Sequence, residues 1–156
     1  MKVQLLVLGK TSQSYVEDGM KIFEKRLSKY YKFSTIIINN QKIKSTDGAV
    51  VKKLEAALLL PYFQKSAINI LLDESGKTFS SKQFAAQFQN WLNRSPDAIN
   101  FFVGGAFGFH KSIYEAAQHK ISLSTMTFSH QLIRLIFMEQ LYRAVSILHN
   151  LPYHNE

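Results

Sequence analysis

The sequence predicts a single α/β domain built on a largely parallel β-sheet, spanning residues 1–156. Short apolar runs alternate with segments of helical period from end to end, which is the order of strands and crossover helices. A chain of 156 residues is long enough for one hydrophobic core and short for two. Hydrophobic residues make up 46% of it and charged residues 19%, a composition typical of a globular protein.

The first half should contain three strands and two helices. Residues 3–8 form an apolar strand closed by Gly9, and residues 33–38 form a β-branched one. Between them, Ser14 and Glu17 have the spacing of a capping box, and apolar residues then recur at intervals of three and four up to Tyr30. A helix over residues 50–58 should end before Pro61, because the residue preceding a proline avoids helical geometry. Residues 67–72 are continuously apolar and predict a strand buried on both faces.

The second half continues the alternation. Residues 73–77 are polar and predict a loop, after which Ser80 or Ser81 can cap a helix. Strands are expected over residues 99–103 and 121–123, with a short helix over 111–118 between them. A polar loop, 124–129, leads into a last helix over 131–148 and a tail to Glu156. That helix is apolar around its circumference, so we expect it to be buried on more than one side, by the domain and, in an oligomer, by a second subunit.

The candidate binding loops follow Leu72, Val103 and Leu123, because ligands of open α/β sheets bind outside the carboxyl ends of the strands. Three glycines in the segment 101–108 fall where a strand turns towards a helix, which allows close approach of the backbone to a ligand. Their G-G-x-x-G spacing, without an acidic residue about 20 positions downstream, disfavours a dinucleotide site. A P-loop is excluded because no upstream glycine accompanies Gly76-Lys77-Thr78.

Metal and hydrolase chemistry have little support. The chain has no cysteine, and its five histidines show no H-x-x-x-H or H-E-x-x-H spacing, so we expect no metal. No G-x-S-x-G element is present for a serine hydrolase. Glu139 and Arg143 are four residues apart on the last helix and are expected to form an ion pair. No apolar run approaches the length of a membrane span, and the expected location is cytoplasmic.

The net charge of +8 is concentrated in the first 65 residues, which carry twelve Lys or Arg against five Asp or Glu. Five of these basic residues lie in one short segment: Lys21, Lys25, Arg26, Lys29 and Lys32. Such a surface suits a polyanion such as RNA. It also suits a helix face that only keeps the protein soluble, and charge by itself leaves both interpretations open.

Five motifs in one order resemble the large-subunit ribosomal RNA methyltransferase H family, of the SPOUT class. The resemblance covers the full length and rests on this set of motifs: Leu72-Asp73 with Gly76-Lys77; Phe102-Val103-Gly104-Gly105 with Gly108; Leu123-Ser124 with Met126-Thr127-Phe128 and His130-Gln131; Arg134 with Glu139-Gln140 and Tyr142-Arg143-Ala144; and Pro152-Tyr153-His154. Two departures are the serine at position 129, where the family usually has proline, and Ala106-Phe107 after the first two glycines.

The resemblance implies a SPOUT α/β-knot fold with a C-terminal trefoil knot, a homodimer, and methylation of N3 of a pseudouridine. The implied substrate is a 23S rRNA hairpin loop in the assembled 70S ribosome, and the implied cofactor is S-adenosylmethionine. The residues that the resemblance assigns to the cofactor are Leu72, Gly104, Gly105, Leu123, Ser124, Thr125, Met126, Thr127 and Phe128.

The resemblance assigns catalysis to Arg143, Tyr153 and His154. In this hypothesis His154, or a water it orients, takes the N3 proton, while Arg143 holds phosphate or developing negative charge. The short tail after Pro152 could serve the cofactor site of either subunit. Two alternatives remain at this point: an RNA-binding protein without catalysis, in which the glycine loop holds phosphate, and a SPOUT enzyme with another RNA target.

Overall fold

A computed structural model describes residues 1–155, so Glu156 lies outside the described part of the chain. Five strands form one sheet in the order β2-β1-β4-β3-β5, and every neighbouring pair is parallel. The strands are β1 (Lys2–Leu8), β2 (Lys32–Ile38), β3 (Ile68–Thr78), β4 (Ala98–Val103) and β5 (His119–Ser122). The predicted α/β class with a parallel sheet is confirmed.

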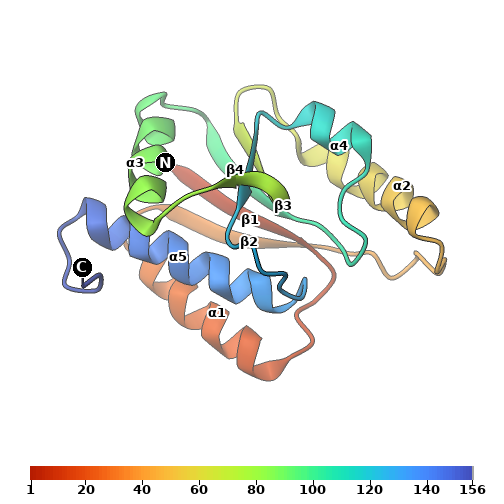
Figure 1. Cartoon of the computed structure of the whole chain (residues 1–156), viewed down its shortest axis with the longest axis horizontal. Helices are drawn as coiled ribbons and strands as arrows, with labels where there is room; N and C mark the ends of the chain where they lie inside the picture. Colours follow the sequence, from red (N-terminus) through yellow and green to blue (C-terminus); the bar gives the residue numbers. More distant parts are fainter. Residues whose placement is uncertain (156) are drawn as a thin grey trace.

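The helices form a layer on each face of the sheet (Figure 1). They are α1 (Ser14–Leu27), α2 (Gly48–Leu59), α3 (Ser81–Asn93), α4 (Lys111–Ala116) and α5 (Leu132–Leu148), with a 3-10 turn at Leu60–Tyr62. Alternate residues of each strand enter two cores: Leu5 and Val7 pack with α1, α3 and α5, whereas Leu6 and Leu8 pack with α2 and α4. No helix within residues 1–155 is long and apolar enough to cross a membrane.

Two helix ends that the sequence predicts, the start of α3 and the end of α2, are confirmed. Ser80 caps α3 and forms a capping box with Gln83, and α2 ends at Leu59, ahead of Pro61. The capping box predicted at Ser14 is wrong. Ser14 is already the first helical residue, and Gln13 occupies the cap without a side-chain hydrogen bond. The helix also ends at Leu27, and Tyr30 packs against the core from the turn that follows.

The loop predicted over residues 73–77 is instead a continuation of β3 to Thr78. Its pairing with β5 shifts register between Leu72 and Lys77, so the polar segment is an irregular strand end. A Cβ on Gly76 would stand 2.6 Å from backbone atoms of Ile121, and the absence of a side chain allows this close approach. The polar composition suggested a loop because this part of the strand extends beyond the core.

Arg134 joins the beginning of α5 to the end of β1. Its side chain is 1% exposed, and its guanidinium donates to the carbonyls of Leu8 (2.8 Å), Gly9 (2.9 Å) and His130 (3.2 Å) and to the Thr11 hydroxyl (3.1 Å). Burial lowers the pKa of Arg134 to about 10, which leaves it charged at neutral pH. The arginine therefore fixes the first turn of α5 by satisfying backbone carbonyls of another element.

We expect Arg134→Met to destabilise the fold by about 2–5 kcal/mol, because an apolar chain of similar length leaves buried carbonyls unsatisfied. Urea unfolding followed by circular dichroism measures this change. Arg94→Met is the matched control, since Arg94 is exposed at the end of α3 and its loss should cost little. Equal stability of the two variants would show that the buried hydrogen bonds contribute nothing net.

Candidate cofactor and substrate sites

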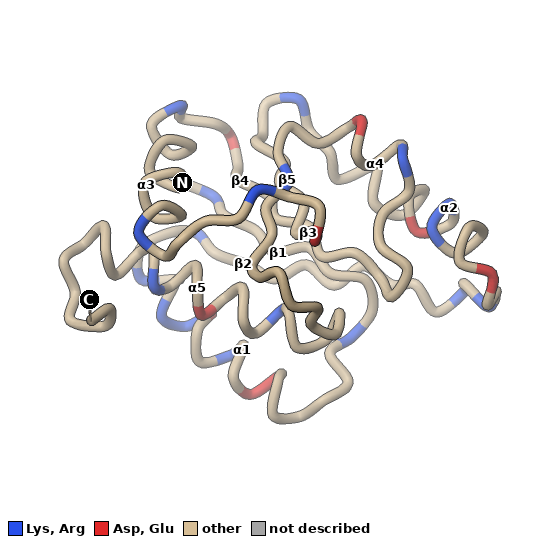
Figure 2. Tube along the Cα trace, in the orientation of Figure 1, with Lys and Arg blue, Asp and Glu red and all other residues tan. Residues whose placement is uncertain are grey.

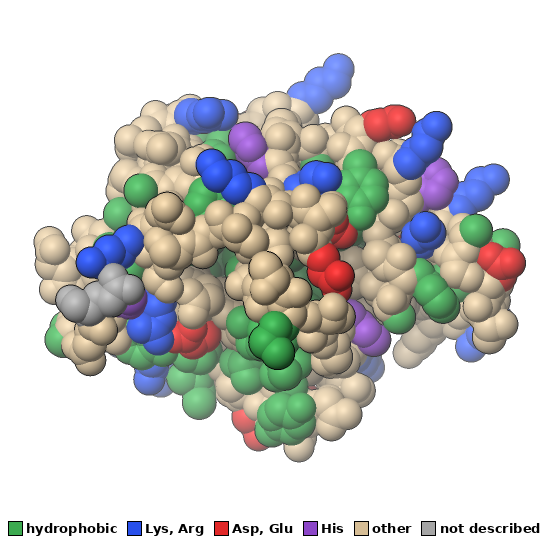
Figure 3. All heavy atoms as spheres, in the orientation of Figure 1, with side chains coloured by type: hydrophobic (Ala, Val, Ile, Leu, Met, Phe, Trp, Pro, Cys, Tyr) green, Lys and Arg blue, Asp and Glu red, His purple; other side chains and the backbone are tan. Residues whose placement is uncertain are grey.

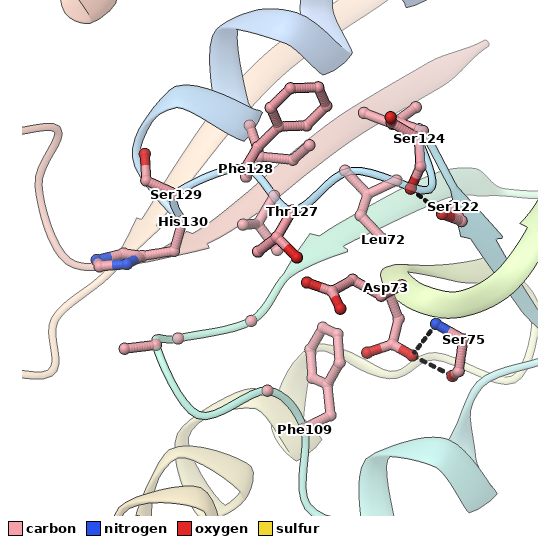
Figure 4. A pocket seen from close by; sticks show the side chains of 18 of the residues that line it. Leu72, Asp73, Ser75, Phe109, Ser122, Ser124, Thr127, Phe128, Ser129 and His130 are labelled. Carbon is pink, nitrogen blue, oxygen red and sulfur yellow. Dashed lines mark hydrogen bonds between the residues drawn. The ribbon is translucent and has the colours of Figure 1, made fainter.

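A cavity of about 660 Å³ lies at the carboxyl ends of β3, β4 and β5, where the strand-end rule places a ligand. This volume is within the range of about 300–1,000 Å³ that small-molecule sites occupy. Three segments form its walls: residues 72–75 of β3, residues 103–109 after β4, and the loop from the end of β5 to α5 (Figure 4). The chain thus forms one pocket of suitable size at the predicted edge of the sheet.

Most of the residues that the sequence assigns to the cofactor line this cavity. They are Leu72, Gly104, Gly105, Leu123, Ser124, Met126, Thr127 and Phe128. Thr125 lies in the same loop, between two lining residues. Residues separated by up to 56 positions in sequence are therefore assembled around a single space.

The glycine turn after β4 packs tightly against Phe109 and Glu55. A Cβ on Gly104 would stand 3.2–3.3 Å from the ring of Phe109, and a Cβ on Gly105 would collide with the carboxylate of Glu55. Glu55 is a buried residue of α2, and burial raises its pKa. Gly108 has a φ of +82°, and its amide donates to the carbonyl of Gly105 at 3.1 Å. The turn therefore needs glycine for space at two positions and for conformation at the third.

The loop after β5 is held by its own serines. Ser122 donates to the carbonyl of Ser124 at 2.8 Å, and the Ser124 hydroxyl accepts from the amide of Met126 at 2.9 Å. Ser129, at the position where the resemblance leads us to expect proline, accepts from the amide of Leu132 at 3.0 Å. A side-chain hydrogen bond thus holds the start of α5 at the position where a rigid proline ring was expected.

Several lining residues were not identified from the sequence. Asp73 and His130 stand in the motifs quoted above but were given no role, whereas Tyr114 of α4 gave no local signal. Tyr114 donates its hydroxyl proton to Asp73 Oδ1 at 2.9 Å. Burial lowers the pKa of His130, and the nearby charge of Arg134 lowers it further, so this imidazole is neutral at pH 7.

The three residues assigned to catalysis come together at the far end of α5. Arg143 forms an ion pair with Glu139 at 2.5 Å, as its spacing predicts, and lies 4.9 Å from the ring centroid of Tyr153. Tyr153 donates to Glu139 at 3.0 Å, and a nitrogen of Arg143 is 3.2 Å from Nδ1 of His154. Burial, followed by the hydrogen bond to Glu139, raises the pKa of Tyr153. We call these four residues the tail cluster.

The tail cluster and the cavity do not meet within one chain. Ile133 lines the cavity at the start of α5, whereas Arg143 is ten residues further along the same helix. At a rise of 1.5 Å per residue this spacing corresponds to roughly 15 Å along the axis. Figure 1 shows the C-terminal tail at the opposite end of α5 from the loop that precedes it. The cofactor and substrate parts of the predicted site are therefore separate in the monomer.

Charge is distributed unequally between these two regions. The cavity lining includes Asp73 and Glu74 but no lysine or arginine, although the protein carries a net charge of +8. Lysines and arginines lie outside the lining, on α1, α2 and α4, on β3 and β5, and around the C-terminal half of α5 (Figure 2). Among residues 1–155, no group of three or more His, Asp or Glu side chains is placed to hold a metal ion.

A parallel α/β sheet with a glycine turn and a cavity at the strand ends defines an α/β protein that binds a small ligand. Comparison with known proteins identifies its family. The chain belongs to the SPOUT methyltransferase family: a family model described as "Predicted SPOUT methyltransferase" matches residues 1–154. The protein is accordingly a methyltransferase.

Its curated relatives include proteins named ribosomal RNA large subunit methyltransferase H. The one from Parabacteroides distasonis is 44% identical over the full length of both chains, and the one from Flavobacterium johnsoniae is 43% identical with the same coverage. The one from Christiangramia forsetii is 44% identical over 99% of each chain. The predicted family is confirmed, while the trefoil knot and the homodimer stay predictions.

Proposed function

We propose that the protein transfers a methyl group from S-adenosylmethionine to N3 of a pseudouridine in a 23S rRNA hairpin loop, on the assembled 70S ribosome in the cytoplasm. The names of its full-length relatives support ribosomal RNA of the large subunit as the substrate. The observation that carries the cofactor assignment is the charge of the cavity. Its wall has the carboxylates of Asp73 and Glu74 and no lysine or arginine. Its histidine, His130, has a lowered pKa, which favours the neutral imidazole.

This charge suits a cationic ligand and opposes a phosphate. A phosphate-binding glycine loop normally combines backbone amides with Lys or Arg, and neither lines this cavity. The alternative in which the glycine loop of a non-catalytic protein holds an RNA phosphate is therefore disfavoured. S-adenosylmethionine supplies, when bound, a methyl group on a positively charged sulfur.

The residues present fit that cofactor. Gly104 and Gly105 leave backbone accessible at the cavity wall, and the loop over residues 123–128 offers further amides and carbonyls on the opposite side. Leu72 and Phe109 contribute apolar surface. Backbone groups held by tight packing would bind a small ligand with little loss of conformational entropy, because the site is already formed.

The tail cluster is the proposed acceptor site. The imidazole of His154, or a water it orients, would take the N3 proton, and Arg143 would hold an RNA phosphate or the developing charge on the base. Glu139 orients both Arg143 and Tyr153 through the contacts described above. Placing the acceptor nitrogen in line with the methyl group supplies much of the rate acceleration in such a reaction.

A homodimer would bring the two parts together. Because the tail cluster lies roughly 15 Å along α5 from the cavity of its own chain, the tail of one subunit would complete the cavity of its partner. The surface beside the cavity supports such a contact: Met126 is 74% exposed, and Phe107 is half-exposed. Figure 3 shows hydrophobic side chains gathered on this face. Exposed apolar surface of this kind marks interaction sites.

Substrate recognition should depend on the assembled ribosome, because a domain this small has limited surface for reading RNA sequence. We expect ribosomes from a strain that lacks the modification to accept labelled methyl groups at one nucleotide, at a rate at least about 100-fold above that of an isolated rRNA hairpin, through added phosphate contacts. Scintillation counting and mapping of the modified base measure both. Methylation of the free hairpin at a similar rate would contradict ribosome-dependent recognition, and modification at another base would indicate a different target.

A further inference from the structure

Asp73 presents to the proposed cofactor cavity a carboxylate that neutral groups orient and that, among residues 1–155, has no direct ion-pair partner. The residue follows Leu72 at the point where β3 passes beyond the sheet core, and Leu72 pairs with Val103, next to the glycine turn. Its side chain lines the cavity (Figure 4). Because β3 lies between β4 and β5 in the sheet, the carboxylate stands between the glycine turn after β4 and the loop after β5, the two segments expected to contact the cofactor.

Neutral donors orient this carboxylate. Tyr114 donates to Oδ1 at 2.9 Å, while the Ser75 amide donates to Oδ2 at 3.1 Å and the Ser75 hydroxyl also contacts Oδ2. Burial, and then the hydrogen bond to Asp73, raises the pKa of Tyr114 to about 12, so the phenol keeps its proton. Hydrogen bonds from neutral groups fix the geometry and leave the negative charge in place.

No lysine or arginine lines the cavity with Asp73. Glu74 is a second acid on the same wall, and His130 across the cavity is neutral. The cation nearest by contact is Lys120, whose ammonium bonds to the Ser75 hydroxyl at 3.2 Å and lies over the ring of Tyr114, outside the cavity lining. Among residues 1–155, Asp73 forms no ion pair. The cavity thus has a net negative wall with one oriented carboxylate.

The two forms of the cofactor differ in charge at one atom. When the methyl group leaves, the carbon–sulfur bond electrons stay on sulfur, the nitrogen–carbon bond forms and the N3 proton goes to a base. The sulfur is positive before the transfer and neutral after it. Coulomb attraction to a fixed carboxylate in a partly buried site therefore favours the form that still carries the methyl group.

We propose that Asp73 is a specificity-determining residue that favours S-adenosylmethionine over its product, S-adenosylhomocysteine. The inference rests on the proposed function, because it assumes that the cavity is the cofactor site. Its consequence is that spent cofactor is held less tightly than fresh cofactor, which promotes exchange of one for the other.

The test is calorimetric titration of the full-length protein with each of the two ligands. We expect Asp73→Asn, which keeps the size of the side chain and one accepting oxygen and whose amide nitrogen can donate to the Tyr114 hydroxyl, to shift the ratio of the two dissociation constants about tenfold towards the product. Tyr114→Phe removes the orienting hydroxyl and keeps the charge, so most of the discrimination should persist. Glu115→Gln removes one exposed negative charge of α4 outside the cavity lining and should leave the ratio unchanged.

The outcomes separate the two proposals. Equal weakening of both ligands in Asp73→Asn would overturn the inference and leave Asp73 as a residue that only orders the cavity wall. An equal shift in Glu115→Gln would also overturn it, because the effect would then belong to overall charge. A wild-type protein that is folded and binds neither ligand would contradict the proposed cofactor itself.

Discussion

Gly104→Val should weaken the binding of S-adenosylmethionine about 10- to 100-fold. A Cβ at this position would already stand 3.2–3.3 Å from three carbons of the Phe109 ring, and the two methyl groups of valine add further bulk. Phe109 is 5% exposed and lines the cavity, so we expect the added bulk to push its ring towards the proposed cofactor space. Overpacking costs of about 1–3 kcal/mol correspond to this loss of affinity.

Calorimetric titration of wild type and variant measures the effect, and thermal unfolding shows whether the variant remains folded. Ala86→Val is the matched control: it adds the same two methyl groups at an exposed position of α3, away from the cavity. We expect its affinity to equal that of the wild type. A folded Gly104→Val protein with unchanged affinity would show that the cofactor does not approach the glycine turn.

His154→Ala should lower turnover by about 100-fold or more, since a positioned acid or base typically contributes this much, while cofactor affinity stays unchanged. The imidazole is held beside Arg143 in the tail cluster, and no residue of that cluster lines the cavity. Single-turnover methylation of ribosomes measures the rate, and calorimetry measures the affinity. His149→Ala is the control, because this nearby exposed histidine only packs on the ring of Tyr30. Wild-type turnover in His154→Ala would remove the residue from the mechanism.

The same two variants test whether the site is shared between subunits. In a mixed dimer, a Gly104→Val subunit would supply the intact tail and a His154→Ala subunit the intact cavity. If the tail of one subunit serves the cavity of the other, mixing should restore one working site for each mixed dimer. No recovery, with subunit exchange shown by mass spectrometry, would place tail and cavity in the same subunit.

The sequence by itself determined the α/β class, the position of each strand core and the edge of the sheet that carries the site. These features depend on local pattern: continuous apolar runs specify buried parallel strands, and Ser80 and Pro61 act on the residues next to them. The assignment of Leu72, Gly104 and the loop over residues 123–128 came from ordered motifs, and the structure gathers nearly all of them around one cavity.

Tertiary contacts decided the rest, because they join residues whose partners are distant in the chain. Glu55 packs against Gly105, and Tyr114 orients Asp73, from which it is 41 positions distant in the sequence. Neither pairing has a local signature in the sequence. The continuation of β3 through polar residues depends on Gly76 packing against β5. The sequence named both the cavity and the tail residues and predicted the helix between them, but only the tertiary structure showed that the tail folds against Arg143 and Glu139 and not into the cavity.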